Sequence, residues 1–196
     1  MIGEKVSLVA GTVAPPLTVS TIIAAVESSP HVNWLTQISE YLPNDPGLRA
    51  ALFASGLFEF AFTYGFRKSL PPSRIYDISR IGLGIAGLSL SVTAITDPHT
   101  LIHEIAAGTT FTAAPASIAA TGGDMIAKSQ KAFGIYSVIV AFGAAATLAS
   151  GLFTGHFLTG LTETIATADM GAWVTGSSIW ALITDRVRDL PAPPEK

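Results

Sequence analysis

Two carboxyl groups and two imidazoles crowd the short segment from Asp97 to Glu104, which lies between two long apolar runs. Its histidines, His99 and His103, are four residues apart, so one turn of helix would place them on the same face. Imidazole and carboxylate groups transfer protons and bind metal ions. We therefore take this segment as the first candidate for a functional site.

The dipeptide Asp97-Pro98 predicts the start of a helix, because aspartate is a favoured N-cap residue and proline is favoured in the first helical position. Three structural explanations compete with a functional one. Asp97 would serve only as the cap, His99 would be a solvated loop residue, and His103 would make a hydrogen bond to a neighbouring helix.

Further polar residues extend the candidate site along the chain. An ionisable side chain within an apolar helix faces the bundle interior or a water-filled cavity, because it is costly in hydrocarbon. The candidate ligand-binding residues are Glu59, His103, Glu163 and Asp169. For Glu59 and Asp169 the alternative is a protonated carboxyl group with a local hydrogen bond to serine or threonine.

Two chemical hypotheses use overlapping residues. A catalytic site would draw on Ser39, Asp97, His103 and Glu104. A metal site would draw on the imidazoles of His99, His103 and His156, and zinc is the metal that such a set favours. The spacing alone assigns neither reaction nor cofactor, so whether the protein is an enzyme stays open.

The composition indicates a membrane protein. Of the 196 residues 49% are hydrophobic and only 13% are charged, whereas soluble domains carry about 25% charged residues. The net charge of −3 gives no basic patch for nucleic acid. The absence of cysteine excludes disulfides and thiolate chemistry.

Six segments approach the length of about 20 apolar residues that a membrane-spanning helix needs. They are 6–26, 48–66, 75–96, 101–121, 132–154 and 165–184. All are rich in small residues, which let membrane helices pack closely. We therefore predict an all-α, integral membrane bundle of six transmembrane helices, forming one domain over residues 1–190 and followed by a flexible tail at 191–196.

The basic residues predict the orientation of this bundle. With both termini in the cytoplasm, ten of the 11 lysines and arginines lie on the cytoplasmic side, and only Arg49 lies outside. This asymmetry is the positive-inside signal of a multi-pass protein of the cell membrane. Residues 27–47 then lie outside, where apolar residues at helical spacing predict a short interfacial helix between the first two spans.

One apparent motif in the third segment is better explained by packing. Residues 82–87 match the dinucleotide-binding pattern G-x-G-x-x-G, but they lie inside an apolar span and follow no strand. We therefore expect these glycines to allow close contact between helices.

Three short motifs resemble the DUF998 family of six-helix prokaryotic membrane proteins. They are Ala10 to Pro16, Gln37 to Tyr41, and Asp97 with His103 and Ala106-Ala107-Gly108. The chain has Gln37 and Glu40 where the family tends to have asparagine and aspartate. The resemblance implies the six-helix plan and marks Ser39, Asp97 and His103, but it implies no reaction.

Three functions are compatible with these features. The first is an outward-facing polar site that binds a membrane lipid or a small ligand, and the second is a metal-dependent lipid hydrolase or transferase. The third is a proton-coupled transporter that uses Glu59, Glu104 and Asp169, for which an assembly of several copies is expected because no inverted halves are evident. A homo-oligomer is compatible with each, and membrane lipid is the expected partner.

Overall fold

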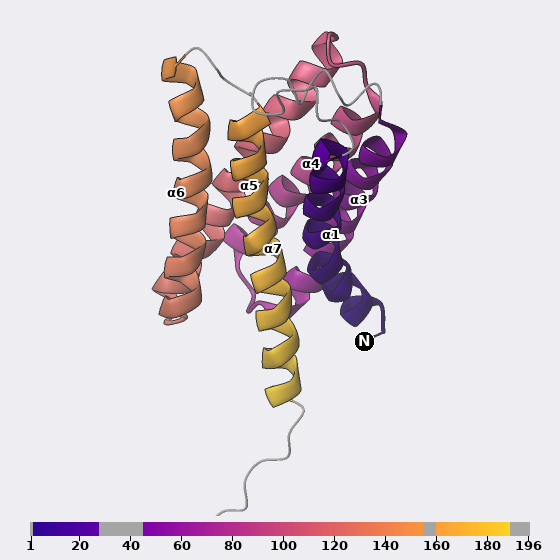
Figure 1. Cartoon of the computed structure of the whole chain (residues 1–196). Coiled ribbons are helices and arrows are strands. Elements are labelled where there is room, and N and C mark those ends of the chain that lie inside the picture. The colour runs from indigo at the N-terminus through magenta and orange to yellow at the C-terminus, as the bar shows by residue number, and fades with distance from the viewer. Residues whose placement is uncertain (1, 28–44, 155–159, 189–196) are drawn as a thin grey trace, which may run out of the picture.

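The computed structural model describes residues 2–27, 45–154 and 160–188, and these residues form six helices and no strand (Figure 1). The helices are α1 (Ile2–Glu27), α3 (Pro46–Ser69), α4 (Arg74–Ile95), α5 (Leu101–Ala127), α6 (Lys131–Thr154) and α7 (Gly160–Arg188). The all-α, six-helix prediction is therefore confirmed. The predicted interfacial helix with Ser39 falls within residues 28–44, outside the described residues, as does the tail at 191–196.

The helices pack as a closed ring around a shared core. Each helix from α3 to α7 contacts the next one along the chain, and α1 closes the ring against α3 and α7. Helix α7 also contacts α3 and α5, so it lines the middle of the bundle. The first residues of α1 and the last turn of α7 lie at the same end (Figure 1). This arrangement brings residues from distant segments together in the interior.

Three of the described helices are long and apolar enough to cross a membrane by length and composition. These spans are Gly3–Ala24, Arg74–Ile95 and Lys131–Ser150. Helices α3, α5 and α7, which contain Glu59, His103 and Asp169, are not among these three spans. These helices show membrane character, but length and composition identify three spans among the described helices, fewer than the six expected.

Glycines bring neighbouring helices into backbone contact. A Cβ atom added to Gly87 would lie 2.7 Å from the carbonyl oxygen of Gly56, so α3 and α4 touch at this point. A Cβ added to Gly122 would lie 2.8 Å from the carbonyl oxygen of Gly134, which joins α5 to α6. The prediction that Gly87 in the G-x-G-x-x-G segment serves helix packing is confirmed.

The adjacent glycines Gly122 and Gly123 give a matched test of this contact. We expect Gly122→Ala to lower the stability of the purified protein by about 1–3 kcal/mol, because the methyl group overpacks the α5–α6 contact. Gly123 has nothing within 4 Å of an added Cβ, so Gly123→Ala should be neutral or stabilising by up to about 1 kcal/mol. Thermal unfolding in detergent measures both, and an equal effect of the two substitutions would contradict the packing argument.

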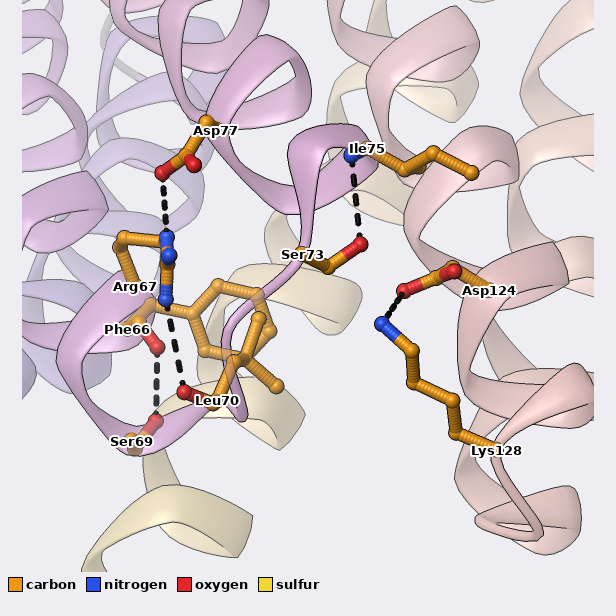
Figure 2. Close-up of polar contacts among 9 residues, drawn as sticks. All are labelled: Phe66, Arg67, Ser69, Leu70, Ser73, Ile75, Asp77, Asp124 and Lys128. Atoms are coloured by element: carbon orange, nitrogen blue, oxygen red, sulfur yellow. Dashed lines mark hydrogen bonds and ion pairs between the residues drawn. The ribbon is translucent and has the colours of Figure 1, made fainter.

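One end of the bundle, here called the basic end, holds the α3–α4 turn at 70–73 and the α5–α6 turn at 128–130. Figure 2 shows its polar contacts. The Nε of Arg67 lies 2.6 Å from Oδ1 of Asp77, and the same guanidinium donates to the carbonyl oxygen of Leu70. Ser73 caps α4 by accepting the backbone N–H of Ile75. These contacts fix the turn between α3 and α4.

A second ion pair at the basic end lies on the last turns of α5. The Nζ of Lys128 lies 2.6 Å from Oδ2 of Asp124 (Figure 2) and 4.7 Å from the ring centre of Tyr76 on α4. Burial would raise the pKa of Asp124, but the hydrogen bond from Lys128 holds that pKa below its ordinary value. Lys128 therefore ties α5 to α4 at this end, opposite the end that carries His103.

Candidate functional site

The α4–α5 turn differs from the sequence prediction in where the helix begins. Helix α5 starts at Leu101, and its N-cap is Thr100, whose side chain accepts the backbone N–H of His103. The side chain of Asp97 instead accepts the backbone N–H of His99 at 2.9 Å, within the turn. The prediction of Asp97 as N-cap was therefore wrong, because Thr100 competes for the same capping role three residues later.

Because α5 starts at Leu101, His99 and His103 lie in different surroundings. His99 is an exposed turn residue, whereas His103 lies in the first turn of α5 and is only 8% exposed. Its Nδ1 lies 3.3 Å from Oγ1 of Thr96 at the end of α4. The two imidazoles therefore do not share a helical face, and only His103 reaches the interior.

Arg49 stabilises the same corner of the bundle. Its Nε donates to the carbonyl oxygen of Ala94 at 3.0 Å, and a second guanidinium nitrogen donates to that of Ile95 at 2.8 Å. The last carbonyls of a helix have no intrahelical partner and carry partial negative charge, so a cation there is stabilising. Arg49 thus links the start of α3 to the end of α4, far from the basic end.

His103 lines a cavity of about 70 Å³ at this end of the bundle, and Glu163 lines the same cavity. Thr93, Thr110 and Thr167 add hydroxyl groups to its wall, and the remaining wall is mostly apolar. Since roughly 10–15 Å³ of cavity volume is enough to hold one water, the cavity has room for several waters or a small polar group. The structure thus brings together two candidates that are far apart in the sequence.

Glu163 reaches the cavity because α7 begins earlier than predicted. The sequence predicted the last span over residues 165–184, but the helix starts at Gly160 and has Glu163 in its first turn. Thr167 lies one turn further along the same face. Hydropathy alone missed this turn because its polar side chains face a cavity inside the bundle.

A smaller cavity of about 30 Å³ adjoins the first one and is lined by Glu59. The two cavities share Leu90, Thr110 and Thr167 in their walls. Beyond Glu59 along α3, Phe62 and Phe66 pack edge-to-face against Trp173, with ring centres 6.2 and 5.3 Å apart. The polar path from His103 and Glu163 therefore ends at Glu59 against an aromatic cluster.

Both carboxyl groups along this path are without partners among the described residues. Neither Glu59 nor Glu163 makes a hydrogen bond or an ion pair within that part of the chain. No lysine or arginine occurs in the described wall of either cavity. Both side chains are partly buried, and because a polar group that is removed from water without a partner is costly, these carboxyls favour water, a cation or a hydrogen-bond donor beside them.

The other candidates lie apart from this cavity. Asp169 faces α6, where its Oδ2 would be 3.3 Å from a Cβ added to Gly143. Glu104 and Asp97 are exposed. Ser39 and His156 lie outside the described residues. Within the described ranges no three histidine, aspartate or glutamate side chains come together as a metal site would require.

The cavity also contains residues that the sequence analysis did not select. Thr93, Thr110 and Thr167 come from three helices, and the last two occur in helices with several other threonines. The spacing of Glu163 and Thr167 on one helical face is the signal that could have identified the last of them. The sequence identified Arg49 only as the lone basic residue on the outer side, and its hydrogen bonds to the end of α4 were found in the structure.

The fold and its apolar helices define an all-α bundle of membrane type with a polar cavity in its interior. The chain belongs to the DUF998 family, described as a protein of unknown function, whose sequence pattern matches residues 12–180. No curated protein and no solved structure shows a significant match to this chain.

Proposed function

We propose that this protein is a multi-pass protein of the cell membrane whose outward-facing cavity binds the cationic or hydrogen-bond-donating group of a lipid or small ligand. The observation that carries the proposal is that His103 and Glu163 line one cavity whose described wall contains no lysine or arginine. A positively charged or donating group would give these side chains the partner that a buried site needs.

The exposed surface supports six spans, including the three helices of lower hydropathy. All six described helices expose large apolar side chains, among them Val6, Phe60, Ile78, Ile105, Ile139 and Ile183. Soluble monomers rarely expose apolar patches larger than a few hundred Å². A hydrocarbon environment around the whole ring accounts for this pattern.

The cavity suits the charged end of a ligand better than a whole lipid. About 70 Å³ holds an ammonium group or a few waters. The carboxyl group of Glu163 and the hydroxyl oxygens of Thr110 and Thr167 accept hydrogen bonds, and an ammonium group donates three. We therefore expect a primary amine to be recognised.

Butylamine provides a direct test of this site. We expect isothermal titration of the protein in nanodiscs to show saturable binding, and Glu163→Gln to weaken it by about tenfold or more. Removing one partner of a buried charged pair costs about 2–5 kcal/mol, and each 1.4 kcal/mol is about tenfold in affinity.

Glu104→Gln is the matched control, because Glu104 is exposed beside His103 and does not line the cavity. It should leave butylamine binding unchanged. Binding that is absent in the wild type, or that responds equally to both substitutions, would rule out the proposed site.

The two alternatives differ in their support. A proton-coupled transporter draws support from the second cavity, since Glu59 extends the polar path toward the middle of the bundle. A metal-dependent hydrolase or transferase rests on the sequence alone, because its residues Ser39 and His156 lie outside the described part of the chain. Butylamine-driven proton uptake that is present in vesicles with the wild type and lost in vesicles with Glu59→Gln would favour the transporter.

A further inference from the structure

A third cavity, of about 420 Å³, lies between α5 and α6 and is almost wholly apolar. Small residues shape it, including Gly108, Ala116, Ala145 and Ala149. Its single described polar side chain, Thr112, donates its hydroxyl to the carbonyl oxygen of Gly108 at 2.8 Å. This groove, defined by these residues, therefore offers no group that would hold water.

The groove faces the surface that hydrocarbon would cover. Phe142 at its edge is 68% exposed, and Ala116 and Ala145 are also exposed. Pro115 lines it from within α5. An apolar groove on the side of a membrane helix pair is open to an alkyl chain from the surrounding lipid.

Phe111 connects this groove to the polar cavity. It is 9% exposed and is the residue that lines both the groove and the cavity of His103 and Glu163. One aromatic ring on α5 thus lies between the cavity of Glu163 and an apolar groove. An amphiphile has the same two parts, a polar head joined to an apolar chain.

We propose that the ligand is an alkylamine-type amphiphile, a membrane lipid with an amine head and an alkyl chain. The amine lies in the cavity beside Glu163, and the chain lies in the α5–α6 groove. The ring of Phe111 lies beside the point where the amine head joins the chain. This inference rests on the proposed function, since it assigns the chemical class of the ligand of that same site. Lipid tails are as apolar as the groove, so moving the chain from the lipid into the groove adds little affinity. The groove therefore selects and orients the chain, and the amine supplies most of the affinity.

A photoactivatable dodecylamine with a diazirine midway along its chain tests this arrangement in nanodiscs. We expect irradiation to label α5 and α6 at the groove, and excess butylamine to reduce that labelling by about tenfold, as for a competitor at one head site. Ala145→Phe fills the groove and should reduce labelling there by about tenfold while leaving butylamine binding unchanged.

Ala146→Phe is the control, because Ala146 is an exposed neighbour on α6 that does not line the groove. It should keep the labelling of the wild type. Labelling that is insensitive to Ala145→Phe, or spread evenly over all helices, would overturn the placement of the chain. If butylamine binding still depended on Glu163 in that case, the proposed function would stand. If the wild type did not bind butylamine, both the proposed function and the placement of the chain would be ruled out.

Discussion

Single cysteines on either side of α5 should react from opposite sides of the membrane. The chain has no cysteine of its own, so every reaction with a maleimide reports the introduced residue. We expect His99→Cys to be labelled by a membrane-impermeant maleimide in intact cells, and Lys131→Cys to be labelled only after the membrane is opened. Both positions are exposed, and the positive-inside rule places them on opposite sides.

This experiment tests whether α5 spans the membrane. Helix α5 lies between the two cysteines and is not among the three helices that are apolar enough by composition. Ile139→Cys on α6, whose native side chain is 65% exposed, serves as the control. It should stay unlabelled in both conditions if hydrocarbon covers it. Labelling of positions 99 and 131 from the same side would show that α5 does not cross.

Replacing Trp173 by alanine should cause the largest loss of stability of any single substitution in the core. Its side chain is fully buried, it packs edge-to-face on Phe62 and Phe66, and its Nε1–H donates to Oγ of Ser137 at 2.8 Å. Truncation of such a residue costs about 3–5 kcal/mol, since a cavity remains. Thermal unfolding of the purified protein in detergent measures the change.

Trp173→Phe separates the packing of the ring from its hydrogen bond. Phenylalanine keeps an aromatic ring against α3 but loses the N–H, so we expect a loss of about 1 kcal/mol from the hydrogen bond, plus a smaller packing term. Ser137 keeps its own bond to the carbonyl oxygen of Phe133. Equal losses for the alanine and phenylalanine variants would mean that the aromatic cluster contributes little.

The sequence was enough to predict many of the residues of the candidate site, but it did not predict which of them lie together. Glu59, His103 and Glu163 were selected because ionisable residues next to apolar runs need an interior partner. Asp169 met the same criterion, yet it lies against Gly143 on α6. Each residue turns the helix by about 100°, so a small difference in rotation decides whether a carboxyl group faces the cavity or a neighbouring helix.

By itself the sequence determined the helices and the membrane character, because long apolar segments can satisfy their backbone groups in hydrocarbon only as helices. It also predicted the packing role of Gly87, but the close contact between Gly122 and Gly134 was found only in the structure. Only the tertiary structure decided that His103 and Glu163 share a cavity, that Thr100 rather than Asp97 caps α5, and that Phe111 stands between the cavity and the groove. These contacts depend on how the helices are rotated against one another, which packing across the whole ring sets.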